Sequence, residues 1–160
     1  PEISGYISIA GPGQTVDKTM VEQINNQNAD LAKLAGEHFQ ELKTTDTILK
    51  VHPFLMQVFQ PQNQKFLKSW MMLDPVVEIK KITIPMLLIH GEEDLQVTKI
   101  DLEKLKGKQP NSQVALIPHM NHVLKDVYSM ADNQNSYFKE DFPLSSELVE
   151  VIVEFINPKK

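Results

Sequence analysis

The spacing of hydrophobic residues changes twice along the chain. Residues 5–10 form a short apolar run that ends at the Gly-Pro-Gly breaker of residues 11–13, which is typical of a strand followed by a turn. From residue 14 to about residue 75 the apolar residues recur at helical spacing, in stripes separated by polar joints rich in Asn, Gln, Thr and Pro. We interpret this stretch as a helical insertion rather than a second domain with a large core of its own.

Beyond this stretch the pattern alternates between strands and helices. Residues 84–89 and 114–117 are continuously apolar, which indicates short central strands, parallel and covered by helices on both faces. Thr98 and Asp101 have the spacing of a capping box for a helix between these strands, which runs to Lys106 and stops at Gly107. This order predicts an α/β fold with about three parallel strands.

A closing amphipathic helix follows the last predicted strand. The chain enters this helix through Pro143 and Ser145. Its apolar side is formed by Leu148, Val151, Ile152, Phe155 and Ile156.

Composition and charge narrow the function classes. The chain has 160 residues, with 16 basic residues, all of them Lys, against 21 acidic residues, and a net charge of −5. This balance argues against binding to nucleic acid or to an anionic membrane surface, because both require concentrated positive charge. The absence of Cys excludes disulfides, thiol nucleophiles, and zinc or iron–sulfur sites built on Cys.

Polar residues gather after the two apolar strands of the C-terminal part. Residues 90–97 follow the first and residues 118–125 follow the second, and functional side chains of an open parallel sheet lie just beyond the carboxyl ends of its strands. An acid after one strand and a histidine after its neighbour can meet, so that the carboxylate orients the imidazole and stabilises its protonated form. The candidate acids are Asp94, Glu92 and Glu93, and the candidate bases are His122 and His119.

These two segments resemble parts of a known family, the α/β-hydrolases, in particular its serine esterases, lipases and aminopeptidase-like members. The stretch IPMLLIHGEED at residues 84–94 looks like their penultimate strand and acid loop. PHMNH at residues 118–122 looks like the loop after their last strand. The resemblance implies that Asp94 is the triad acid and that His122 is the general base.

The same resemblance implies an order of parts along the chain. Residues 66–75 look like the end of a helical cap inserted between two core strands. Residues 1–13 then correspond to a core strand with its Gly loop, residues 14–75 to the cap, and residues 76–160 to the C-terminal core. The chain is expected to be the C-terminal half of the fold.

The nucleophile of this family is not found in the chain. Family members carry it on a G-x-S-x-G turn, and no such motif occurs here; Ser8 lies inside a predicted strand instead. The chain starts with Pro rather than Met, so we expect it to be processed or to be a piece of a longer protein. The expected function is the C-terminal portion of a serine hydrolase that cleaves carboxylic esters, or amides, and is inactive without its nucleophile. Any targeting signal would lie upstream of Pro1, so no compartment is predicted.

An apolar set in the helical stretch is a candidate substrate pocket. Its side chains are soft or aromatic and can line an acyl or aromatic pocket beneath the cap. The alternative is that they pack the cap itself, which their helical spacing favours. The set comprises Met56, Phe59, Phe66, Trp70, Met71 and Met72.

No metal or cofactor is expected. His90, Asp94, His119 and His122 offer oxygen and nitrogen ligands, but their spacing matches no standard metal site. Acyl transfer by a serine needs only side chains and backbone amides. His119 is nearer the strand than His122, and we expect its ring to pack against the end of the sheet.

The predicted partners are a small-molecule ester or amide and the missing N-terminal half of the fold. Without that half, the first strand would expose an unpaired edge, which is a template for dimerisation or aggregation. Two other hypotheses stay open: a self-standing, non-catalytic module whose helical region binds a partner, and a degenerate hydrolase kept for regulation or scaffolding. No nucleic acid or membrane partner is expected.

Overall fold

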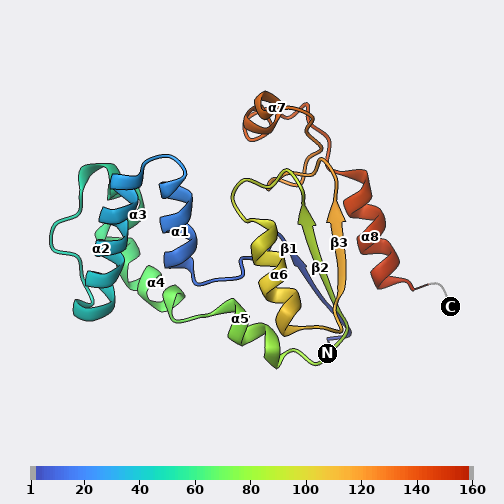
Figure 1. Cartoon of the computed structure of the whole chain (residues 1–160), viewed down its shortest axis with the longest axis horizontal. Coiled ribbons are helices and arrows are strands. Elements are labelled where there is room, and N and C mark those ends of the chain that lie inside the picture. The colour runs from blue at the N-terminus through green and yellow to red at the C-terminus, as the bar shows by residue number, and fades with distance from the viewer. Residues whose placement is uncertain (1–2, 159–160) are drawn as a thin grey trace. The chain divides into compact units, whose positions relative to one another are not determined.

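A computed structural model describes residues 3–158 of the chain (Figure 1). The chain divides into two compact units. The first, called the sheet unit below, comprises Pro1–Gly13 and Ile79–Lys160, and the second, the helical unit, comprises Gln14–Glu78. No helix among the described residues is long and apolar enough to cross a membrane.

The sheet unit is built on three parallel strands. These are β1 (Tyr6–Ile9), β2 (Met86–Gly91) and β3 (Gln113–Ile117), and their order in the sheet is β1-β2-β3. Every residue of β2 is buried, as its continuous apolar run predicted. The predicted α/β class with three parallel strands is therefore confirmed.

Strand β2 lies two residues further along the chain than the predicted apolar run of residues 84–89. It continues past the predicted end at Ile89, because His90 pairs with Leu116 and Gly91 pairs with Ile117 on β3. The ladder of backbone hydrogen bonds, rather than side-chain hydrophobicity, sets the end of this strand. The polar segment that follows therefore begins directly at the edge of the sheet.

Helices cover both faces of this sheet. Figure 1 shows α6 (Lys99–Lys108) on one face and α8 (Ser146–Ile156) on the other. Helix α6 begins with the predicted capping box of Thr98 and Asp101. It does not stop at Gly107 as predicted, because its last turn closes through the Gln109 N–H, which donates to the Leu105 and Lys106 carbonyls.

Helix α8 packs its apolar side on the sheet. Leu148 is part of the core, and Val151, Ile152 and Phe155 pack against it, as predicted. Ile156, which was expected on the same face, is 61% exposed, because it is the last residue of the helix and borders an open cavity. The sheet unit also contains two short helices, η2 (Ile79–Lys81) and α7 (Met130–Asn135).

The helical unit has a hydrophobic core of its own, so the expectation that residues 14–75 lack a large core is wrong. The predicted stripes fold into helices whose buried sides face one another. The core is formed by Val16, Ala35, Phe39, Leu42, Ile48, Leu55, Phe59, Leu67 and Met71. The helices are α1 (Val16–Asn25), α2 (Ala29–Thr45), η1 (Pro53–Leu55), α3 (Met56–Phe59), α4 (Pro61–Met71) and α5 (Pro75–Glu78).

Candidate active site

The turn after β2, called the acid loop (residues 92–98), fixes one carboxylate. The side chain of Asp94 is fully buried, with 0% exposure. Its Oδ1 accepts hydrogen bonds from the backbone N–H groups of Gln96, at 2.8 Å, and Val97, at 3.0 Å. These two bonds hold the carboxylate in one orientation and leave Oδ2 for another partner.

The turn after β3, called the base loop (residues 118–127), is tightly folded around His122. The Asn121 N–H donates to the Lys125 carbonyl at 3.0 Å, and the Leu124 N–H donates to the Asn121 carbonyl at 3.0 Å. Leu124 has a left-handed backbone, with φ 64°, although it is not a glycine. Backbone of this kind is unfavourable and is kept where surrounding contacts impose it, often at functional sites.

The two loops meet at Gly91. A Cβ atom at this position would lie 2.1 Å from the Met120 carbonyl oxygen, so only glycine allows this close approach. The same carbonyl accepts a hydrogen bond from the Glu93 N–H at 3.0 Å, and the Glu92 N–H donates to the Ile117 carbonyl at 3.0 Å. Backbone contacts therefore hold the acid loop and the base loop together.

Asp94 and His122 form the pair that the sequence suggested. The Nδ1 atom of His122 lies 2.9 Å from Oδ2 of Asp94, and the His122 side chain is 30% exposed. The hydrogen bond to Asp94 raises the pKa of His122; burial lowers it in part, and the negative charge of Asp94 raises it further. Because the carboxylate accepts, Nδ1 carries the proton and Nε2 is the basic nitrogen of the neutral ring. A buried acid thus orients a partly exposed base.

The other candidate acids and bases are placed differently. Glu92 and Glu93 are exposed. His119 is also exposed, and the prediction that its ring packs against the sheet end is wrong. Its backbone is left-handed, with φ 59°, and its ring lies against that of Tyr128, tilted by 39° with 4.6 Å between the centroids.

His90 is close to the pair but is buried within strand β2. It is 2% exposed, and burial lowers its pKa; the carboxylates of Asp94 and Asp101 act in the opposite direction. We therefore expect a neutral imidazole at neutral pH. Among the residues that the structure describes, no three His, Asp or Glu side chains are arranged to hold a metal ion.

The residues predicted to line a pocket separate into two groups. Phe59 and Met71 belong to the core of the helical unit, with 0% and 5% exposure. Met56, Phe66 and Trp70 are on the surface of that unit, and the Phe66 and Trp70 rings lie with their centroids 5.4 Å apart. Packing therefore accounts for the first two, and a substrate-binding role for the other three stays a prediction. Met72 is also exposed.

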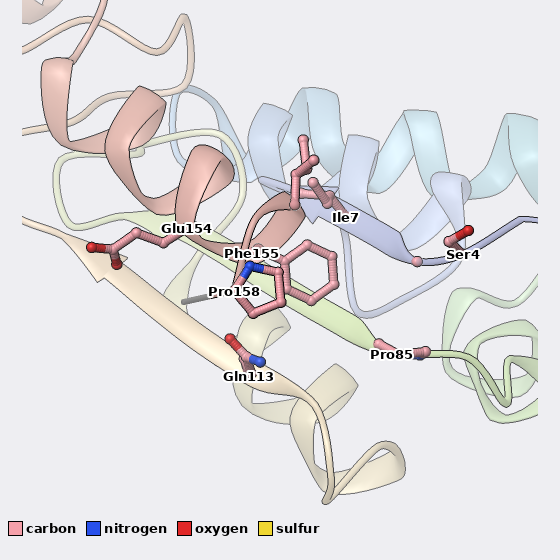
Figure 2. A pocket seen from close by; sticks show the side chains of 9 residues that line it. Ser4, Ile7, Pro85, Gln113, Glu154, Phe155 and Pro158 are labelled. Atoms are coloured by element: carbon pink, nitrogen blue, oxygen red, sulfur yellow. The ribbon is translucent and has the colours of Figure 1, made fainter. Parts of the chain in front are cut away.

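An apolar cavity of about 610 Å³ lies at the other end of the strands (Figure 2). Gly5 precedes β1, Pro85 precedes β2, and Gln113 begins β3, while Phe155 comes from the end of α8. Asp94 and His122, by contrast, follow the carboxyl ends of β2 and β3. This cavity is therefore separate from the acid–base pair.

Three buried polar residues near the pair were missed in the sequence. Asn121 precedes His122 in the base loop, and Asn133 and Ser136 lie in and after α7; all three are at most 3% exposed. One signal for α7 is present: Ser129 and Asp132 have the S-x-x-D spacing of a helix start, and the Ser129 hydroxyl accepts from the Asp132 N–H at 3.0 Å.

The chain is similar to proteins named as esterases and hydrolases. No family model matches it. It is 29% identical over 125 residues to the esterase EstD of Thermotoga maritima, a match that covers 75% of this chain and 29% of that protein. The chain thus spans less than a third of the length of this curated relative.

Three solved structures align with most of this chain at low sequence identity. E-2-(acetamidomethylene)succinate hydrolase has 12% identity and a TM-score of 0.49, with 96% of this chain and 57% of that chain covered. A thermophilic esterase from Thermogutta terrifontis has 14% identity and a TM-score of 0.47, with coverage of 96% and 55%. A bromoperoxidase from Bacillus anthracis has 19% identity and a TM-score of 0.48, with coverage of 96% and 58%. The resemblance to esterases expected from the sequence is thus found in the match to EstD.

Proposed function

We propose that this chain carries the acid and the base of a serine hydrolase that cleaves carboxylic esters, or amides, by acyl transfer. In this proposal the nucleophilic serine and the oxyanion donors lie outside residues 1–160, and the chain is inactive without them. The helical unit is the cap that shapes the substrate pocket. The similarity to an esterase over 125 residues supports a hydrolase function.

One observation carries the proposal: a fully buried carboxylate holds a partly exposed imidazole at 2.9 Å, on loops that follow two adjacent parallel strands. A carboxylate so placed fixes the tautomer of the ring and stabilises the imidazolium that forms during the reaction. The orientation of the Asp94 carboxylate is already fixed before it contacts His122, because two backbone N–H groups donate to its Oδ1. This geometry supports the proposed roles of Asp94 as the orienting acid and His122 as the general base.

The proposed reaction uses His122 twice. Nε2 of His122 takes the proton of the serine hydroxyl as the serine oxygen attacks the substrate carbonyl carbon. The imidazolium, stabilised by Asp94, then gives that proton to the departing alcohol oxygen or amine nitrogen as its bond to the carbonyl carbon breaks. In the second half of the reaction, His122 takes a proton from water as the water oxygen attacks the carbonyl carbon of the acyl-enzyme. His122 then gives this proton to the serine oxygen as the acyl–oxygen bond breaks, which releases the acid and restores the serine.

The free edge of β1 is the proposed contact with the missing half of the fold. Among the described residues, β1 pairs within the sheet with β2 alone, so one row of its backbone groups has no strand beside it. Such an edge pairs readily with another chain. We expect the 160-residue chain to self-associate in light scattering, and we expect co-production with the upstream residues to abolish this. A monomeric chain that does not bind the upstream part would contradict the proposal.

A serine-reactive fluorophosphonate tests the function on the natively produced protein that contains this sequence. We expect one label per chain, on a serine outside residues 1–160, in a species heavier than 18.2 kDa. We also expect His122→Ala to prevent labelling, because the serine then lacks its base, and His119→Ala to label normally as the matched control. An unlabelled wild-type protein, or equal labelling of the His122→Ala protein, would refute the proposal.

A further inference from the structure

Helix α7 links the two loops that hold Asp94 and His122. Figure 1 shows this helix beyond the arrowheads of the strands, on the side where the acid and base loops lie. It is short and inserted between the base loop and α8. The contacts that it makes fall on the residues directly before the acid and the base.

The side chain of Asn133 contacts both loops. Its Nδ2 donates to the Glu93 carbonyl at 2.8 Å, and Glu93 directly precedes Asp94. Its Oδ1 accepts from Nδ2 of Asn121 at 3.2 Å, and Asn121 directly precedes His122. Asn133 is 3% exposed; its bond to Asn121 is buried, and its bond to the Glu93 carbonyl is partly buried. One amide thus bridges the residue before the acid and the residue before the base.

The rest of the buried network supports the same bridge. Asn121 donates its second amide hydrogen to the Ser136 hydroxyl at 2.7 Å, and that hydroxyl donates to the Asn133 carbonyl at 2.8 Å. Oδ1 of Asn121 accepts from the Lys125 N–H at 3.1 Å, which closes the base loop around His122. Buried polar networks with every member paired hold their parts rigidly, and losing one member leaves several groups unpaired.

We propose that Asn133 is a positioning residue for the acid–base pair: its amide locks the acid loop to the base loop and so sets the contact between Asp94 and His122. This inference rests on the proposed function for its catalytic consequence, but the positioning itself is measurable in the 160-residue chain. A second contact acts in the same direction, since Nε2 of Gln96 in the acid loop donates to the Tyr137 hydroxyl at 2.9 Å.

The test is an NMR titration of the His122 ring in the 160-residue chain. We expect Asn133→Ala to move the pKa of His122 back toward 6.5, because the hydrogen bond to Asp94 that raises it is loosened. We also expect the downfield Nδ1–H signal to weaken and the Asp94 amide to exchange on the order of tenfold faster. Asn135→Ala is the matched control, because it removes an exposed asparagine of the same helix, and it should change none of these.

One outcome is that the Asn133→Ala protein folds and is less stable, yet shows the same His122 pKa and the same Nδ1–H signal as the Asn135→Ala control. This result would overturn the proposal. Should that variant fail to fold, Ser136→Ala decides, because it removes a single oxygen from the network: a smaller shift in the same direction supports the proposal and no shift overturns it. In the longer enzyme we expect Asn133→Ala to lower kcat on the order of 10- to 100-fold with KM within about twofold. If His122→Ala leaves ester turnover unchanged while the Asn133→Ala titration shifts, the proposed function fails and the positioning stands.

Discussion

Both units of the molecule bury polar side chains, but the buried side chains of the two units have different kinds of hydrogen-bond partner. In the helical unit, Gln64 accepts from the Ile48 N–H at 2.9 Å and donates to the Phe59 carbonyl at 3.0 Å. His38 accepts from the His52 N–H at 3.1 Å through Nε2. In the sheet unit, the buried Asp94 binds a second titratable group, His122, whose ring is partly exposed.

This difference separates a structural role from a chemical one. Gln64 and His38 form hydrogen bonds with backbone groups of their own unit. The two residues are only 4% and 9% exposed. Asp17 forms an ion pair with Lys43 at 2.6 Å, which joins α1 to α2 within the helical unit. His122 alone among these is an imidazole that combines a buried carboxylate partner, partial exposure and a pKa raised by its hydrogen bond to that carboxylate. Proton transfer is therefore expected in the sheet unit.

The largest expected effect is on the ester hydrolysis that we propose for the longer protein. Asp94→Asn keeps the shape of the acid but reverses the hydrogen-bond preference at Nδ1, so we expect kcat for an ester to fall roughly 10⁴-fold. Glu93→Gln, which makes the same chemical change at the exposed neighbouring position, should stay within about twofold. Steady-state hydrolysis of a chromogenic ester compares the two. Equal rates for both variants would contradict a chemical role for Asp94 in the sheet unit.

The next effect is on the stability of the sheet unit. Gly91→Ala places a Cβ against the Met120 carbonyl oxygen, and we expect the free energy of unfolding to fall by about 3 kcal/mol. Gly107→Ala in α6 meets nothing within 4 Å and should raise it by about 0.5–1 kcal/mol. Urea unfolding followed by the amide signals of β2 measures both. A tolerated Gly91→Ala would show that the loops do not need this close approach.

A smaller effect tests the structural role of buried polar groups in the helical unit. Gln64→Ala leaves the Ile48 N–H and the Phe59 carbonyl without their partner, which costs about 2 kcal/mol of stability. Trp70 lies on α4 in this unit, so its fluorescence in a urea titration reports the loss directly. Gln62→Ala, at an exposed position of the same helix, is the control and should change stability by less than about 0.5 kcal/mol.

The smallest effect is a pH dependence of stability in the sheet unit. The pKa of His122 is raised above 6.5 in the folded chain, so its protonated form stabilises the fold fully below pH ~6.5 and this contribution is lost as the pH rises through the folded pKa. For a ring that is 30% exposed we expect a contribution below about 1 kcal/mol. The unfolding free energies of wild type and His122→Gln should differ most at low pH. A difference that grows with rising pH would have the wrong sign.

The sequence was most informative where one local pattern decides the structure. The apolar runs predicted β2 and β3, and the spacing of Thr98 and Asp101 predicted the start of α6. The strand ends then located the loops, and the family resemblance singled out Asp94 and His122, which the structure brings within 2.9 Å. Their catalytic roles stay a proposal.

The rest depended on contacts between distant segments. Asn121, Asn133 and Ser136 look like solvated loop residues in the sequence, and their burial arises only when the turn after β3 and α7 pack together. The exposure of His119 and the contact of its ring with Tyr128 also depend on how the base loop folds. The core of the helical unit likewise requires all its stripes to face one another.

The most direct test of the account is ester turnover by the natively produced longer protein with His122 removed. Wild type, His122→Ala and His119→Ala are compared at saturating ester, with folding of each variant checked by circular dichroism. We expect kcat to fall on the order of 10⁶-fold in the His122→Ala protein and to stay near normal in the His119→Ala protein. A near-normal rate for His122→Ala would contradict the account.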